Sequence, residues 1–189
     1  MSKSEKIVQK LDLESTITEE DIPAIDLYMD QVIQLFDAKY NESLRNEDEK
    51  VLTKTMINNY AKGKLFIPIK NKKYSKQHIM LISLIYQLKG ALSIKDIKSV
   101  LEPVNEKIET EDFLLEKFYH SWVTLQQKNA QNFLDEMKSH EVEVENQGAD
   151  EIDKLILLIA SFSNMSNAYR KAAELLVDEL SDKRKETKK

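Results

Sequence analysis

Ten lysines lie between residues 50 and 95, and no acidic residue interrupts them. A lysine ammonium group binds phosphate as a point charge, and its binding releases the counterions that condense on duplex DNA. Asn58 and Asn59 stand among these lysines, and a side-chain amide can pair with adenine in the major groove. These residue types therefore predict contact with duplex DNA. The alternative is a solvated face for the lysines and exposed polar positions for the asparagines.

The predicted DNA-contact residues come from one expected helix and the segment that follows it. Thr53 and Thr55 could add phosphate contacts at the N-terminus of that helix, although Thr53 is first of all the expected N-cap. Tyr74 is more often a packing residue of the core or the wing than a DNA contact. The full predicted set is Thr53, Lys54, Thr55, Asn58, Asn59, Lys62, Lys64, Lys70, Lys72, Lys73, Tyr74 and Lys76.

The net charge of −5 conceals a strong asymmetry along the chain. Residues 1–49 carry a net charge of −8, residues 50–95 a net charge of +10, and residues 96–189 a net charge of −7. Acidic flanks repel a polyanion, so they should confine its binding to the basic segment.

Metal and thiol chemistry have little support in the sequence. There is no cysteine, which excludes disulfides, thiolate metal sites and thiol-based sensing. The three histidines, His78, His120 and His140, lie far apart without ligand spacing, so they predict packing or surface positions and no metal site. We expect no cofactor.

Catalysis has no positive support either. Asp26 and Asp30 are one helical turn apart, but no nucleophile or glycine-rich loop accompanies them, so a solvated stripe is the simpler interpretation. Three serines, Ser161, Ser163 and Ser166, lack a companion base. We therefore do not expect an enzyme.

The elements that must position the basic segment are expected to be mostly helices. Only three glycines and three prolines occur in 189 residues, which is too few for an all-β fold. Helices are expected at 23–40, at 52–62 ending at Gly63, after Ser75 to near Gly90, and after Ser93 to before Pro103. Residues 65–67 and 73–74 are expected to pair as a two-stranded wing.

The C-terminal half predicts two long helices, at 111–140 and 149–180. The second carries an apolar heptad seam, interrupted only by Ser166, that predicts packing within the chain or between two copies. The predicted dimerisation residues are Ile152, Leu155, Ile159, Phe162, Tyr169, Leu176 and Leu180. The expected domains are a flexible N-terminus at 1–16, a DNA-binding domain at 17–102, a dimerisation or effector region at 103–181, and a disordered tail at 182–189.

The segment from Leu52 to Leu101 resembles the N-terminal winged helix-turn-helix domain of the MerR family of bacterial transcription regulators. The matching positions are Thr53, Ile57, Tyr60, Leu65, Pro68, Tyr74, Ser75, Leu81, Ile85, Leu88, Ser93, Ile94, Asp96, Ile97 and Leu101. The chain departs from that family in its long first helix, in the loop at 41–50, in a wing without arginines, and in a C-terminal half that is not one long coiled coil. The whole sequence also resembles a bacterial family of uncharacterised proteins taken to be regulators.

The resemblance implies a homodimeric transcription regulator that places the helix at 52–62 in the major groove and the wing on the DNA backbone. The C-terminal half could hold an effector in an aromatic pocket at Phe118, Tyr119 and Trp122, although core packing is the simpler interpretation. No apolar run approaches the roughly 20 residues of a membrane span, so we expect a cytoplasmic protein without membrane contact. The alternatives are a protein- or RNA-interaction module on the same fold, or a small-molecule-binding protein that uses the aromatic pocket.

Overall fold

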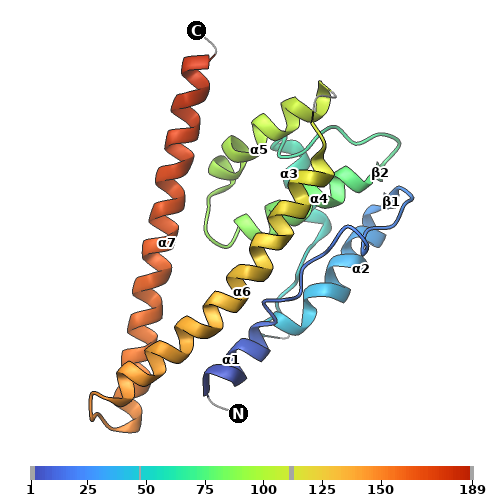
Figure 1. The fold of residues 1–189 in the computed structure, drawn as a ribbon. Coiled ribbons are helices and arrows are strands. Elements are labelled where there is room, and N and C mark those ends of the chain that lie inside the picture. The colour runs from blue at the N-terminus through green and yellow to red at the C-terminus, as the bar shows by residue number, and fades with distance from the viewer. Residues whose placement is uncertain (1–2, 47, 111–112, 188–189) are drawn as a thin grey trace.

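The computed structural model describes residues 3–46, 48–110 and 113–187, and it confirms a mostly helical protein with one small antiparallel sheet (Figure 1). The elements in chain order are α1 (Lys3–Leu11), β1 (Leu27–Tyr28), α2 (Met29–Tyr40), the short 3-10 helix η1 (Asn41–Ser43), α3 (Lys54–Lys62), β2 (Lys73–Tyr74), α4 (Lys76–Leu88), α5 (Ile94–Glu109), α6 (Leu115–Glu145) and α7 (Glu151–Thr187).

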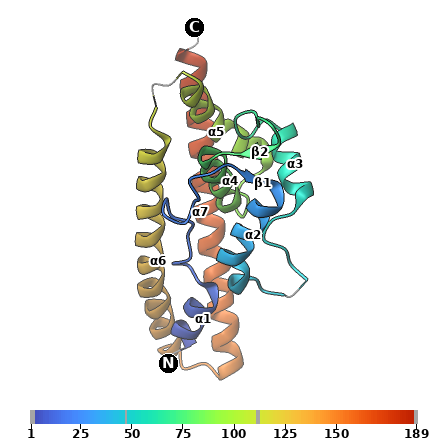
Figure 2. The same ribbon diagram turned by 90° about the vertical axis from the view of Figure 1, so that its right-hand side faces the viewer.

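Helix α4 is the centre of the core. Eight consecutive residues, 78–85, are buried, so α4 is covered on all sides (Figure 2). Buried side chains from α2, α3, α5 and the first turns of α6 join it in one cluster, which includes Phe36, Ile57, Leu101 and Tyr119. A helix that is apolar all round is stable only inside such a core, and this explains why the others surround it.

The helix starts expected from the sequence are confirmed for α3, α4 and α5. Thr53 accepts a hydrogen bond from the main-chain N–H of Met56 at 3.1 Å, and Ser93 accepts one from that of Asp96 at 3.2 Å. Ser75 lies at the start of α4, where its own N–H donates to Nδ1 of His78. Gly63 ends α3 as expected. Capping side chains therefore set the starts of α3 and α4, the helices before and after the lysine-containing segment at 63–75.

The predicted pairing of the two wing strands is wrong. Strand β2 pairs with β1, 45 residues earlier, in the register Leu27 with Tyr74 and Tyr28 with Lys73. Residues 65–67 form no strand because side chains occupy their carbonyl groups: Asn105 donates to Leu65 O at 3.1 Å, and the His78 ring bonds Ile67 O at 3.2 Å. Residues 23–28, expected to begin the first helix, instead lead into β1, so α2 starts at Met29.

The prediction that a helix ends before Pro103 is also wrong, because α5 continues through Pro103 to Glu109. Glu102 and Glu106, on either side of this proline, both pair with Arg184 of α7, and Leu101 is buried in the core. These contacts stabilise the helix beyond the lost N–H donor of the proline. The expected domain boundary at 102/103 therefore falls inside a helix.

Two segments expected to lack regular structure are helical. Residues 3–11 form α1, whose buried Ser4 hydroxyl bonds to the side chain of Glu141 on α6. Helix α7 continues through the expected tail to Thr187, where Arg184 holds it against α5. Helices α6 and α7 diverge from the turn that joins them, and α1 packs beside that end of α6 (Figure 1). Within the described ranges, no helix is long and apolar enough to cross a membrane.

Candidate nucleic-acid interface

Helix α3 presents one polar face to solvent. Ile57 and Tyr60 are buried in the core, whereas the opposite face is exposed along its whole length. The exposed side chains of that face are those of Lys54, Thr55, Asn58, Asn59 and Lys62. All five belong to the set predicted from the sequence. The face carries two lysines, two amides and a hydroxyl without a carboxylate of its own.

The loop after α3 ends in a tight turn formed by residues 70–73. Asn71 and Lys72 both adopt positive φ angles, of 52° and 57°, and Lys73 N donates to Lys70 O at 3.0 Å. Two consecutive residues of positive φ inside such a turn define type I′, which suits the twist of antiparallel strands. The side chains of Lys70 and Lys72 are exposed on this turn. The turn therefore projects two charges into solvent from a fixed backbone.

Side chains of residues 28–30 contact both the start of α3 and the turn at 70–73. Lys54 Nζ lies 2.7 Å from Asp30 Oδ1, and Lys73 Nζ lies 5.3 Å from the ring centroid of Tyr28. Because Tyr28 and Asp30 are two residues apart, the N-terminal end of α3 and strand β2 flank the same short segment. The exposed face of α3 and the turn at 70–73 thus lie on either side of residues 28–30. Together with Lys64, which follows α3, we call them the α3–turn surface: Lys54, Thr55, Asn58, Asn59, Lys62, Lys64, Lys70, Lys72 and Lys73.

The buried ring of His78 fixes the loop against α4. Its Nδ1 accepts from Ser75 N at 3.1 Å, so the protonated Nε2 donates to Ile67 O at 3.2 Å. Burial lowers the pKa of His78 below its ordinary value, in spite of the opposing effect of the carbonyl contacts. The imidazole is therefore neutral near pH 7, as this pair of hydrogen bonds requires.

Three predicted contact residues do not lie freely on this surface. Tyr74 is 1 % exposed and packs in the core against Phe66 and His78, so its predicted DNA contact is wrong for this fold. Thr53 is half-buried as the cap of α3, and Lys76 is half-buried with its Nζ 4.0 Å from Glu19.

One further lysine of the acid-free segment has a structural role. Lys89 Nζ donates to Val51 O at 3.1 Å and lies 4.3 Å from the ring centroid of Tyr86. Burial lowers the pKa of this lysine. Lys89 therefore helps to hold the start of the α3 segment and does not contribute to the exposed basic surface.

Acidic groups border the α3–turn surface in space although they are distant in sequence. Besides Asp30, a groove of about 610 Å³ separates the loop at 64–69 from α5, and Glu102, Glu106 and Glu109 line its far wall. Arg184 pairs with the first two of these carboxylates. Sequence reasoning missed this acidic border because its members come from residues 30 and 102–109, outside the basic segment.

The proposed aromatic pocket is a packing cluster around Tyr119. Tyr119 is fully buried, its hydroxyl donates to Ile17 O at 2.7 Å, and its ring lies 5.2 Å from that of half-buried Trp122. Phe118 is 40 % exposed and lies beside Phe113, 5.8 Å between ring centroids, whereas Tyr119 is turned into the core. The three residues thus do not converge on one cavity.

An apolar cavity of about 360 Å³ lies elsewhere, between α1, α6 and α7. Its lining is largely apolar, with His140 and Tyr169 among the few polar side chains; the apolar members are Ile7, Leu11, Phe133, Met137, Phe162 and Met165. The ring of His140 lies at right angles to that of Phe162, 5.6 Å away, and its Nδ1 is 3.2 Å from the Ser161 hydroxyl. The volume suits a small apolar ligand.

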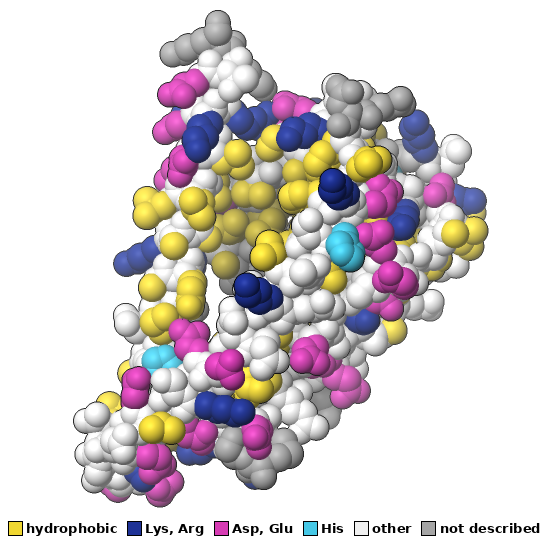
Figure 3. Space-filling model, viewed as in Figure 1, with side chains coloured by type: hydrophobic (Ala, Val, Ile, Leu, Met, Phe, Trp, Pro, Cys, Tyr) yellow, Lys and Arg dark blue, Asp and Glu magenta, His cyan; other side chains and the backbone are white. Residues whose placement is uncertain are grey.

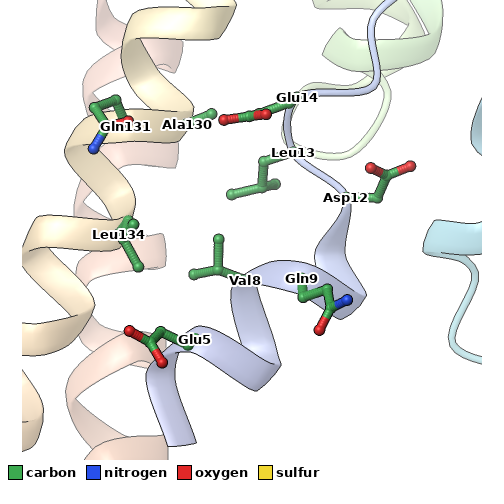
Figure 4. A pocket seen from close by; sticks show the side chains of 9 residues that line it. All are labelled: Glu5, Val8, Gln9, Asp12, Leu13, Glu14, Ala130, Gln131 and Leu134. Carbon is green, nitrogen blue, oxygen red and sulfur yellow. The ribbon is translucent and has the colours of Figure 1, made fainter. Parts of the chain in front are cut away.

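A second depression, of about 330 Å³, lies where α1 and the turn after it face α6 (Figure 4). Val8 and Leu13 point toward Ala130 and Leu134, and carboxylates of the N-terminal segment lie around them (Figure 4). Its polar lining side chains are Glu5, Gln9, Asp12, Glu14 and Gln131, with no serine, lysine or histidine. Within the described ranges, no three His, Asp or Glu side chains are grouped to hold a metal ion.

The seven predicted dimerisation residues all lie on α7. Ile152, Leu155, Ile159, Tyr169 and Leu176 are exposed, whereas Phe162 and Leu180 are half-buried. The packing of this helix within the chain therefore leaves much of the heptad seam uncovered.

Comparison with known proteins identifies a family whose function is not known. A family model described as a domain of unknown function (DUF1836) matches residues 17–122, a little more than half of the chain. No curated protein and no solved structure matches the chain. The matched segment includes the whole α3–turn surface and ends close to Tyr119.

Proposed function

The chain belongs to the DUF1836 family, and we propose that it is a sequence-specific regulator that binds duplex DNA as a homodimer. Helix α3 enters the major groove, where Asn58 and Asn59 read base edges, and the turn at 70–73 holds the phosphate backbone. This is the arrangement of a winged helix-turn-helix, as the resemblance to MerR regulators implies. A dimer would match a two-fold symmetric operator.

One observation carries the proposal: the amides and the lysines share one exposed surface. Base-edge readers and phosphate-binding charges must face the same side of a protein that reads duplex DNA. The salt bridge between Lys54 and Asp30 lies on that surface, but both side chains are more than 60 % exposed. Such a pair contributes little stability, so phosphate can displace Asp30 at small cost.

The test is selection of random duplex DNA on the purified protein, followed by salt titration of the enriched sequence. We expect a palindromic site whose affinity falls steeply with salt and is weakened by Lys72→Ala and Lys73→Ala. Weak binding that is equal for all sequences would reject the proposal. It would favour the interaction-module alternative, in which the same surface binds RNA or an acidic protein. A binding assay with single-stranded RNA would then distinguish RNA from an acidic protein as the partner.

A small-molecule effector is a second candidate function, favoured by the apolar cavity between α1, α6 and α7. Its lining joins α7 to α6 and α1, so a ligand there would contact both long C-terminal helices and the N-terminal helix. A hydrophobic fluorescent probe should bind the protein and be displaced when Met165→Trp fills the cavity. Unchanged probe binding by that variant would exclude this cavity as the site.

A further inference from the structure

The cavity between α1, α6 and α7 is large enough for an organic ligand and opens to solvent. Its volume is about 360 Å³, and most of its lining is apolar. Helix α1 covers it only in part, since its lining residues Ile7 and Leu11 stay 38 % and 39 % exposed. A ligand can therefore enter without separating the helices. Apolar surface that faces water in this way favours an occupant with an apolar body.

One carboxylate stands in this apolar lining without a counter-charge. Glu136 of α6 is half-buried, and its Oε1 accepts only a long hydrogen bond, of 3.5 Å, from the hydroxyl of Tyr169. In the part of the chain that the structure describes, no lysine or arginine lines the cavity, and no cationic side chain pairs with Glu136. A half-buried carboxylate gains most from a charged donor, because hydrogen bonds between opposite charges are the strongest.

The surroundings of the cavity carry the same negative sign. Residues 131–153, which run from the second half of α6 to the start of α7, contain eight acidic residues and one lysine. Figure 3 shows acidic side chains gathered around the end of the molecule where α6 turns into α7. A surface of one sign raises the local concentration of ions of the opposite sign, so this end of the molecule attracts cations and repels anions.

We propose that this cavity binds an apolar organic cation, in which an ammonium group is attached to an aromatic or aliphatic body. The body replaces water against the apolar lining, and the ammonium group donates to Glu136. The rings of Phe133, Phe162 and Tyr169 also line the cavity, and the face of an aromatic ring attracts a cation. The proposal rests on the small-molecule site given above as the second candidate function, and it does not depend on DNA binding.

Three ligands that share one skeleton and differ in their polar end test the charge. Calorimetric titration of the full chain at neutral pH compares 4-phenylbutylamine, 4-phenylbutanol and 4-phenylbutyrate, which are cationic, neutral and anionic. We expect the amine to bind most tightly and the carboxylate most weakly. Equal binding of the amine and the alcohol would overturn the preference for a cation but keep the cavity as an apolar site. Binding of none of the three would overturn both the cation and the candidate site.

Two variants that each remove one negative charge test the role of Glu136. Glu136→Gln should weaken binding of the amine by about tenfold, to the level of the alcohol, and leave binding of the alcohol unchanged. Asp135→Asn is the matched control, because Asp135 is exposed one residue earlier on α6 and does not line the cavity. The amine should bind this control as it binds the parent chain.

Two results with these variants would overturn the proposal. Equal losses of amine binding in Glu136→Gln and Asp135→Asn would show attraction by the whole acidic end of the molecule instead of a site at Glu136. Met165→Trp, which fills the cavity, should weaken binding of the amine and the alcohol alike. Amine binding that is undiminished in that variant would place the amine outside the cavity.

Discussion

The hydroxyl of Tyr119 donates a hydrogen bond to the main-chain carbonyl of Ile17 at 2.7 Å, across 102 residues of sequence. Burial raises the pKa of this hydroxyl well above its ordinary value, so it remains a donor. Tyr40 accepts from Ile17 N–H on the other side at 3.3 Å. Ile17 is also the first residue of the family match, which ends three residues after Tyr119. The matched segment is thus closed by a contact between its own two ends.

Two tyrosine-to-phenylalanine substitutions should have different effects on stability. Tyr119→Phe leaves the buried Ile17 carbonyl without its donor and should lower the free energy of unfolding by about 1–3 kcal/mol. Tyr74→Phe should have little effect or stabilise the protein, because its buried hydroxyl has no hydrogen-bond partner among the described residues. Urea denaturation measures both values. Equal losses in the two variants would contradict this account of Tyr119.

Asn58→Ala should reduce discrimination between DNA sequences more than it reduces affinity. Losing a paired amide contact with a base removes about 1–3 kcal/mol of discrimination at one position of the site. The measurement compares binding of the selected site with that of the same site carrying single base changes. Asn129→Ala is the control, because Asn129 is an exposed amide on α6, far from the α3–turn surface. Unchanged discrimination in Asn58→Ala would remove this residue from the reading set.

Lys72→Gly should separate stability from DNA binding. Lys72 has a φ of 57°, and relieving that conformation with glycine should stabilise the fold by about 1 kcal/mol. The same change removes one phosphate-binding charge, so the slope of log K against log salt should fall by about 0.9. Thermal unfolding and salt titration give the two numbers. A more stable protein with an unchanged salt slope would exclude Lys72 from the DNA contact.

The stability of the protein should fall as the pH decreases through about 6.5, the ordinary pKa of histidine. Because the pKa of His78 is lowered in the folded state, the unfolded chain binds more protons between the folded and unfolded pKa values. The contribution of the neutral His78 to the free energy of unfolding is therefore fully present above pH 6.5. It is lost as the pH falls from there through the lowered pKa of the folded state. Denaturation at pH 7.5 and 5.5 measures the change. His78→Gln should lose most of this dependence, whereas His120→Gln, at an exposed histidine, should keep it.

Local signals in the sequence predicted the starts of α3, α4 and α5. Thr53, Ser75 and Ser93 act on neighbouring residues, so their capping is visible in a short stretch of sequence. The pairing of β1 with β2 was not predictable in this way, because a two-residue strand has no periodicity. Its partner was decided by tertiary contacts: the carbonyl groups of Leu65 and Ile67 bond to Asn105 and His78, which lie in other helices.

The candidate surface was predictable to a similar extent. The spacing of Lys54, Asn58 and Lys62 placed them on one face of a helix, because residues four apart share a face. The same spacing could not reveal that Tyr74 points inward. Side chains alternate along a strand, but which of the two faces packs on the core depends on the strand with which β2 pairs. Nor could it reveal Asp30 beside Lys54, a neighbour that exists only in the folded chain.

The pairing of Arg184 with Glu102 and Glu106 has a mechanical consequence. Helix α7 is about 55 Å long, at 1.5 Å for each of its 37 residues, and Arg184 joins its far end to α5. Helix α5 is also one wall of the groove whose other wall is the loop that leads to the lysine turn. A sliding or rotating α7 must therefore either break the two ion pairs or move α5 with it, and in the second case the displacement reaches the groove beside that loop.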